Sequence, residues 1–136
     1  RGGELALGYR RSLFTDHPEA VVLRAKLALQ SGSAEQIKAR MDELAAKRRA
    51  SQPLELPSAG STFKRPEGYF AAALIDQCGL KGMRVGGAEV SRKHAGFIVN
   101  VGGAKCADVL ALIQKVQDTV FTATGVTLEP EVKIIQ

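Results

Sequence analysis

An apolar stripe in the last third of the sequence limits the folds that are open to this chain. Its members recur at the three- and four-residue spacing of one helix face: Val109, Leu112, Ile113, Val116 and Val120. Gly125 follows at a position where a glycine commonly ends a helix. Such a helix must bury its apolar face against another layer, and we expect an extended terminal strand over residues 126–135 after it.

The first half of the chain predicts a strand, a helix and a long loop. Residues 20–29 alternate between apolar and other side chains, which is typical of a half-buried strand. Ser33 and Gln36 have capping-box spacing and precede a helix that ends in the basic run 47–49. The loop that continues to residue 66 has no period, and a loop of that length in a compact domain is usually functional or disordered.

The second half adds a helix and two strands. A helix is predicted over about 70–78, because apolar residues recur there every four positions and a glycine follows. Residues 83–90 and 95–101 predict two short strands, with Gly86–Gly87 marking a bulge or a close backbone approach inside the first. The irregular alternation of elements predicts an α+β fold, a small mixed or antiparallel sheet with helices packed on one face.

Composition narrows the classes of function. The 136 residues carry 45% hydrophobic side chains, enough for one core, and a net charge of +5 that favours an anionic partner. Nucleic acid is disfavoured because the cations are spread along the chain and aromatic residues make up only 5%. No apolar run is long enough to cross a bilayer. The first residue is Arg1 and not Met, so we expect a fragment of a longer protein.

The cysteines and histidines predict no metal site. Cys78 and Cys106 lack metal-ligand spacing, and we expect both to be buried free thiols in a reducing compartment. His94 falls in the turn between the two predicted short strands, with no second ligand at a suitable spacing.

A polar segment between Pro57 and Pro66 is the strongest candidate for a binding loop. Ser61 stands close to Lys64 and Arg65, and two cations beside hydroxyl groups suit a phosphate or carboxylate. The alternatives are a serine that caps a turn and cations that are merely solvated. A hydrolase nucleophile is disfavoured, because the segment lacks the second glycine of a nucleophile elbow.

Two other polar clusters have ordinary interpretations when taken alone. Tyr9 and Arg10 belong to a basic cluster that would pass for surface charge. Glu129 and Glu131 alternate with apolar residues in the tail, as charges on an edge strand do.

The order of the motifs is more informative than any one of them. Along the chain there follow Gly8-Tyr9-Arg10-x-Ser12, Ser58-Ala59-Gly60-Ser61-Thr62-Phe63-Lys64-x-Pro66, Gly86-Gly87-Ala88-x-Val90-Ser91, His94-Ala95-x-Phe97-Ile98-Val99-Asn100 and Glu129-Pro130-Glu131-Val132. This order resembles the UDP-N-acetylenolpyruvoylglucosamine reductase family, the MurB family of peptidoglycan synthesis, over nearly the whole chain.

The resemblance implies a domain organisation and a reaction. Residues 1–32 would be the end of the FAD-binding domain and residues 33–136 the substrate-binding domain, with most of the flavin-binding region outside this sequence. The family is an oxidoreductase of the cytoplasm: NADPH reduces FAD, and the flavin reduces UDP-N-acetylglucosamine enolpyruvate to UDP-N-acetylmuramate for the cell wall of a growing and dividing bacterium. This chain alone would be inactive.

The resemblance also implies roles for individual residues. Ser61 matches the proton donor, while Arg10 and Glu131 match the two residues that flank the substrate carboxylate. Further substrate contacts would come from Tyr9, Lys64, Arg65 and His94, although Arg65 departs from the asparagine of many relatives. Two alternatives remain, an isolated UDP-sugar-binding domain and a noncatalytic anion-binding module.

Overall fold

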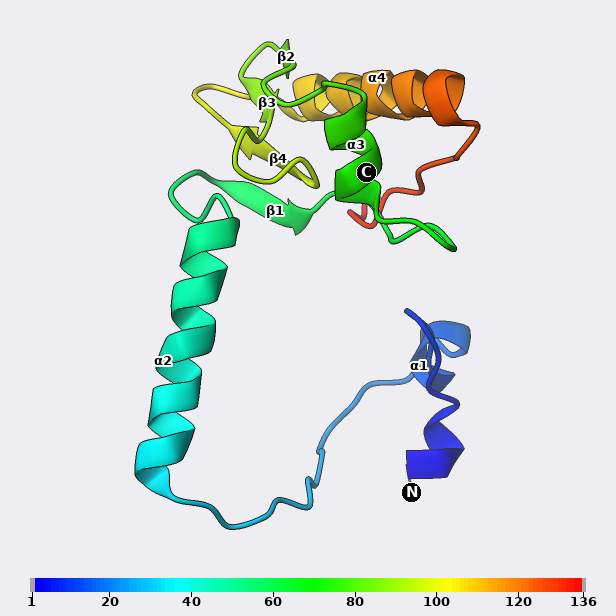
Figure 1. Cartoon of the computed structure of the whole chain (residues 1–136). Helices are drawn as coiled ribbons and strands as arrows, with labels where there is room; N and C mark the ends of the chain where they lie inside the picture. The colour runs from blue at the N-terminus through cyan, green and yellow to red at the C-terminus, as the bar shows by residue number, and fades with distance from the viewer. Residues whose placement is uncertain (1, 136) are drawn as a thin grey trace. The chain divides into compact units, whose positions relative to one another are not determined.

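The computed structural model describes residues 2–135 (Figure 1). The described residues form two compact units, which meet between Gln36 and Ile37 in the sequence. This division falls near the predicted boundary between residues 32 and 33. The assignment of the two parts to a flavin-binding and a substrate-binding domain stays a prediction.

The first unit contains little regular structure. It begins with a 3-10 helix, η1 (Gly2–Leu5), and a short helix, α1 (Leu13–Asp16). Ser12 precedes α1, and its backbone N–H donates to the Thr15 hydroxyl at 2.9 Å.

The strand predicted over residues 20–29 is wrong. The segment has no regular secondary structure, and its apolar side chains are exposed, with Leu23 at 93% and Leu29 at 85%. A strand needs a neighbour to receive its backbone hydrogen bonds, and no such neighbour pairs with 20–29 among the residues that the structure describes.

The predicted capping box does begin a helix, α2 (Ala34–Ser51). The Gln36 N–H donates to the Ser33 hydroxyl at 3.4 Å. No residue of α2 is buried, and ion pairs along the surface accompany it, among them Lys38–Asp42 at 2.9 Å. Hydrogen bonds from Lys47 and from Arg40 hold the pKa of Glu43 below its usual value.

A four-stranded antiparallel sheet forms the centre of the second unit, in the order β1-β4-β3-β2. Its strands are β1 (Ser58–Ser61), β2 (Arg84–Val85), β3 (Ala88–Val90) and β4 (Phe97–Asn100). The long loop predicted up to residue 66 therefore contains a strand. The sequence hides it because β1 is made of small polar residues, and its pairing with β4 is distant in the chain.

The strand predicted over 83–90 is two strands. Gly86–Gly87 forms the turn between β2 and β3, with Gly86 at a φ of +54°. The close backbone approach predicted there is confirmed: a Cβ on Gly87 would lie 2.2 Å from the Gly102 carbonyl oxygen.

Two helices complete the core. The helix α3 (Ala71–Gln77) contacts α4 (Cys106–Thr124), and α4 packs along β2 and β3 (Figure 1). The predicted stripe on α4 is buried through Leu112, Ile113, Val116 and Val120. Gly125 ends α4 in the left-handed conformation, at a φ of +72°. The predicted α+β class, with helices covering an antiparallel sheet, is confirmed.

The tail after α4 is not the predicted strand over 126–135. It forms one isolated bridge, between Phe63 and Pro130, and buries Leu128. Proline lacks the N–H that a longer ladder would need.

Both cysteines are free, as predicted, but the predicted burial is wrong. Cys78 is only partly buried, and Cys106 is exposed. Cys78 follows the last residue of α3, and Cys106 opens α4 outside the buried stripe. Within residues 2–135, no helix combines the length and apolar character needed to span a membrane.

Candidate functional site

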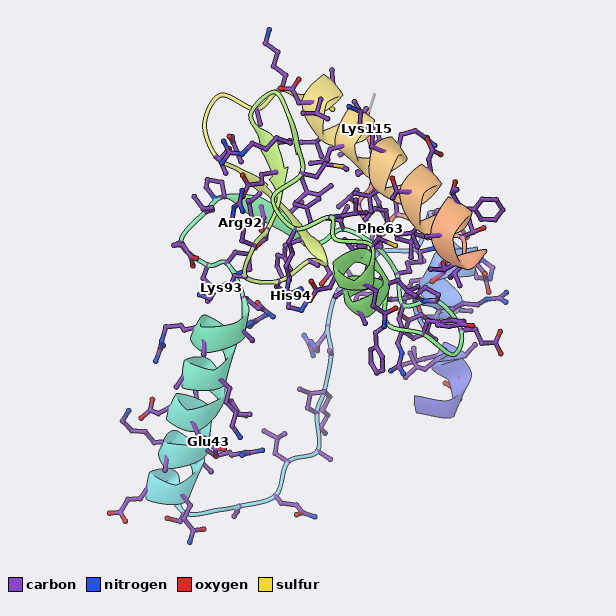
Figure 2. The ribbon with its side chains drawn as sticks, turned by 45° about the horizontal axis from the view of Figure 1, so that its top comes forward. Glu43, Phe63, Arg92, Lys93, His94 and Lys115 are labelled. Carbon is purple, nitrogen blue, oxygen red and sulfur yellow. The ribbon has the colours of Figure 1, made fainter. Side chains whose placement is uncertain are left out.

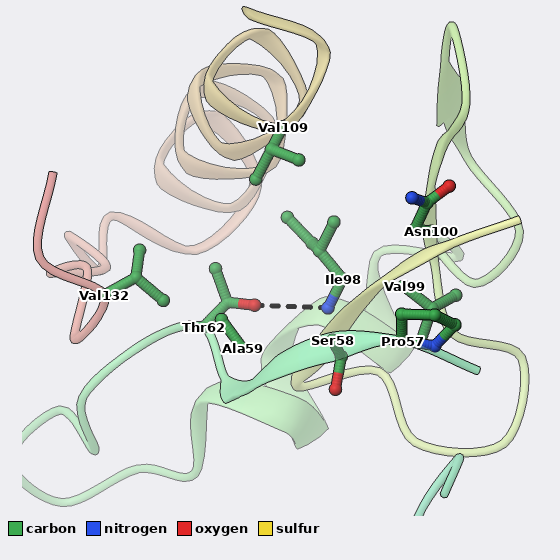
Figure 3. A pocket seen from close by; sticks show the side chains of 9 residues that line it. All are labelled: Pro57, Ser58, Ala59, Thr62, Ile98, Val99, Asn100, Val109 and Val132. Carbon is green, nitrogen blue, oxygen red and sulfur yellow. Dashed lines mark hydrogen bonds between the residues drawn. The ribbon is translucent and has the colours of Figure 1, made fainter. Parts of the chain in front are cut away.

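A buried threonine anchors the segment that carries Ser61. Thr62 is 3% exposed, and its backbone N–H donates to the Gly96 carbonyl at 2.8 Å. Its hydroxyl accepts from the Ile98 N–H at 3.1 Å (Figure 3). Ser61 is exposed and follows Gly60, whose φ of +87° favours glycine. The exposed Ser61 hydroxyl is thus carried by a backbone that the bonds of Thr62 to Gly96 and Ile98 hold against β4.

The structure brings the Glu131 segment beside the Ser61 segment. The Glu131 N–H donates to the Thr62 carbonyl at 2.8 Å, and the Lys64 N–H donates to the Glu129 carbonyl at 2.8 Å. Glu131 is therefore hydrogen-bonded to Thr62, the residue that follows Ser61, although half the chain separates Ser61 from Glu131 in sequence.

Two of the predicted cations are already engaged. The Lys64 ammonium forms an ion pair with Glu129. The Arg65 guanidinium lies over the Phe70 ring, 3.9 Å from its centroid, and its Nε donates to the Tyr69 carbonyl at 3.3 Å. A ligand anion would have to compete with these contacts.

His94 is held in one orientation. Its Nδ1 accepts from the Gly96 N–H at 3.2 Å, and its ring meets Phe97 edge-on at 5.0 Å. Since Nδ1 accepts, the neutral ring carries its proton on Nε2, which leaves a donor for a ligand.

Lys93 is a nearby cation that sequence reasoning treated only as part of a turn. Figure 2 shows Lys93 and His94 on the turn between β3 and β4. The Lys93 Nζ donates to the Arg49 carbonyl at 2.7 Å and to the Glu55 carboxylate at 3.4 Å. A backbone hydrogen bond is the main cause that holds the pKa of Glu55 below its usual value. Burial opposes it, and the hydrogen bond and charge of Lys93 each lower the pKa by less.

Arg10 lies in the first unit, and its backbone is unusual. Its φ is +55°, a conformation that costs a residue other than glycine about 1 kcal/mol or more. Its guanidinium lies 5.7 Å from the centroid of the Tyr9 ring. Because Ser61 and Glu131 belong to the other unit, the convergence of Arg10 with them stays a prediction.

A pocket of about 340 Å³ lies beside the Ser61 segment (Figure 3). Its lining is mostly apolar and comes from β1, β4, α4 and the tail: Pro57, Ser58, Ala59, Thr62, Ile98, Val99, Asn100, Val109 and Val132. Thr62 and Val132 are the chain neighbours of Ser61 and Glu131, so the pocket adjoins the segments that carry both residues. Among the described residues, no group of three or more His, Cys, Asp or Glu side chains could hold a metal ion.

Comparisons with known proteins agree on one family. The model of the UDP-N-acetylenolpyruvoylglucosamine reductase C-terminal domain matches residues 52–135. UDP-N-acetylenolpyruvoylglucosamine reductases of Pediococcus pentosaceus and Exiguobacterium sibiricum are 57% and 55% identical over 97% of this chain. The crystal structure of the reductase (MurB) from Thermus caldophilus aligns with 98% of the chain at a TM-score of 0.81 and 40% identity.

The chain spans less than half of these longer proteins: 44% and 43% of the two relatives and 47% of the solved chain. The family model covers more than half of the chain and includes Ser61, Lys64, His94 and Glu131. This chain belongs to the UDP-N-acetylenolpyruvoylglucosamine reductase family, with residues 52–135 corresponding to its carboxy-terminal domain.

Proposed function

We propose that this chain is the substrate-binding part of a longer flavin-dependent reductase. The whole protein converts UDP-N-acetylglucosamine enolpyruvate to UDP-N-acetylmuramate with NADPH, in the cytoplasm, for peptidoglycan synthesis. The observation that carries the proposal is the hydrogen bonding of the Ser61 segment to the Glu131 segment within the region that matches the family model.

The reaction requires two services from the protein. Addition of a hydride to the vinyl group leaves negative charge on the adjoining carbon and its carboxylate, so the site must stabilise an enolate and then deliver a proton. The Ser61 hydroxyl delivers the proton, which an unactivated hydroxyl can do because the carbanion is far more basic than water. The Arg10 guanidinium and the Glu131 carboxyl group hold the substrate carboxylate and stabilise the enolate.

FAD supplies the hydride when it is bound, but the residues described here do not fit its diphosphate. The glycine-rich turn before α4 is the nearest approach to a phosphate loop, and three of its amides are already occupied. The Asn100 side-chain oxygen accepts from the Gly102 N–H at 2.9 Å and from the Ala104 N–H at 3.2 Å. The Asp108 carboxylate accepts from the Lys105 N–H at 2.9 Å. We therefore assign the FAD diphosphate to the part of the longer protein outside this chain.

The substrate diphosphate and sugar bind to the cations and hydrogen-bond donors around the site. Lys64 exchanges its exposed partner Glu129 for a phosphate oxygen, at little cost because an exposed ion pair contributes only about 0–1 kcal/mol. His94 offers its Nε2 proton, and Tyr9 approaches with the Arg10 segment. Arg65 contributes positive charge from its place over Phe70.

An assay of the longer protein tests this function. With FAD bound, we expect NADPH oxidation that depends on UDP-N-acetylglucosamine enolpyruvate and yields a product heavier by two hydrogens. UDP-N-acetylglucosamine is the matched control, because it carries the same diphosphate without a vinyl group and should not be reduced.

Binding measurements separate the alternatives. Binding of the enolpyruvyl substrate without turnover by the flavin-loaded protein would favour a noncatalytic UDP-sugar-binding domain. Salt-steep binding to DNA with no affinity for the UDP-sugar would favour a general anion-binding module.

A further inference from the structure

The second unit buries one charged side chain among the described residues, and the proposed reaction does not use it. Glu89 on β3 is 4% exposed, and the other buried polar residues, Thr62 and Ser91, are uncharged. Burial of a carboxylate costs several kcal/mol unless cations compensate it, and an apolar residue often serves stability as well. The presence of Glu89 therefore calls for a reason beyond packing.

Two arginines compensate Glu89 from different elements. Arg84 is its cross-strand neighbour on β2, and its Nε pairs with one carboxylate oxygen. Arg92 lies on the turn after β3, and its Nε is 3.3 Å from the other oxygen. Of these two pairs, the Arg92 pair is the one that connects the buried carboxylate to the turn. Figure 2 shows Arg92 on this turn beside Lys93 and His94.

The absence of a side chain at Gly82 leaves the space that the Arg92 guanidinium occupies. A Cβ on Gly82 would lie 2.6 Å from the central carbon of the Arg92 guanidinium, so any side chain at this position would displace it. Gly82 is fixed to the sheet, because its N–H donates to the Val90 carbonyl at 2.8 Å. The Arg92 guanidinium is thus paired with Glu89 and lies close to the Gly82 backbone, although 71% of the Arg92 side chain is exposed.

Hydrogen bonds within the turn between β3 and β4 connect the Arg92 segment to the candidate site. The Ser91 hydroxyl accepts from the Lys93 and His94 N–H groups, each at 3.2 Å. The Gly96 N–H donates to the His94 ring, and the Gly96 carbonyl accepts from the Thr62 N–H. A set of hydrogen bonds therefore runs from Ser91, the chain neighbour of Arg92, to the segment that carries Ser61.

We propose that Arg92, paired with Glu89 and close to Gly82, is a positioning residue that fixes the turn between β3 and β4 and thereby orients His94 toward a bound anionic ligand. This assignment rests on the proposed function for its effect on substrate binding. The orientation of His94 can be tested without any activity.

The test compares Arg92→Ala with Arg84→Ala in the full-length protein. Both variants remove one cation from Glu89, so both should lower the midpoint of thermal unfolding, but only Arg92→Ala removes a side-chain contact of the turn between β3 and β4. NMR signals of the His94 ring nitrogens, assigned with a His94→Gln variant, report the bond to Gly96. We expect them to shift in Arg92→Ala and to stay unchanged in Arg84→Ala.

Steady-state kinetics give a second readout. KM for the UDP-sugar should rise about tenfold in Arg92→Ala, as a displaced binding group requires, with kcat changed far less. Arg92→Lys should recover part of this loss, because it retains a cation for Glu89. Gly82→Ala should shift the His94 signals in the same way with both charges in place, and it covers the case in which Arg92→Ala does not fold. The φ of +81° at Gly82 also strains an alanine there, so the ring signals and not the stability of this variant are compared.

Either of two results would overturn the proposal: unchanged His94 signals in Arg92→Ala and Gly82→Ala, or equal changes in Arg84→Ala. If the parent protein turns out not to reduce the UDP-sugar, the proposed function fails. The ring signals still decide the role of Arg92 in that case.

Discussion

Replacing Ser61 with alanine in the full-length protein is expected to slow the oxidation of reduced flavin by the UDP-sugar about 10²–10⁴-fold, the usual contribution of a general acid. Ser61 is exposed at the end of β1, and Thr62 holds its backbone through bonds to Gly96 and Ile98. The substitution removes the hydroxyl and leaves this support in place. A single-turnover experiment followed by flavin absorbance measures the net oxidation of the flavin. Slow protonation lowers this net rate, because an unprotonated enolate can return its hydride to the flavin.

Ser58→Ala is the matched control for that experiment. Ser58 is also an exposed serine of β1, and its hydroxyl accepts only a long 3.4 Å bond from the Gly60 N–H. Ser58 also lines the pocket beside β1, so KM for the UDP-sugar is not compared; at saturating UDP-sugar we expect this variant to react at the parent rate with flavin bound. An unchanged rate in Ser61→Ala would remove Ser61 from the mechanism.

The largest loss of stability is expected from Gly87→Ala. The added Cβ would lie 2.2 Å from the Gly102 carbonyl oxygen and 2.4 Å from the Ala104 nitrogen, and both are backbone atoms that no side-chain rotation can move. The same region holds the bond from the Val101 N–H to the Gly87 carbonyl, at 2.9 Å. The hairpin must therefore separate from the loop before α4, at about 3 kcal/mol of unfolding free energy, the upper end of ordinary overpacking.

Gly103→Ala separates steric conflict from backbone strain. Gly103 has a φ of +65°, and a Cβ there would meet no atom within 4 Å, so only the left-handed conformation is penalised, by about 1–2 kcal/mol. Denaturant titrations of both variants give the comparison through their midpoints at constant slope. A smaller loss for Gly87→Ala than for Gly103→Ala would show that the hairpin and loop are not in contact.

Much of the fold was predictable where local pattern and packing agree. The stripe on α4 has the helical period, and a glycine ends the helix, so its extent follows from the sequence. The segment 20–29 shows the limit of such patterns. Its alternation fits a strand, but a strand exists only with a partner, and none pairs with it in the part of the chain that the structure describes.

The candidate site was less accessible to local reasoning. Ser61 and Glu131 each had an ordinary interpretation, and only the order of the motifs related them to one family. Their proximity depends on the bond between the Glu131 N–H and the Thr62 carbonyl, which no local period encodes. The hydrogen bonds of Lys93 were not predictable either, because its partners, Arg49 and Glu55, lie on segments distant in sequence.

The central claim is that Ser61, Arg10 and Glu131 surround one reacting group. A crystal structure of the full-length protein with FAD and the UDP-sugar measures this directly. We expect the Arg10 guanidinium and the Glu131 carboxyl group within about 3.5 Å of the substrate carboxylate, and the Ser61 hydroxyl at a similar distance from the carbon that takes the proton. A bound enolpyruvyl group with any of these three side chains beyond reach would contradict the account.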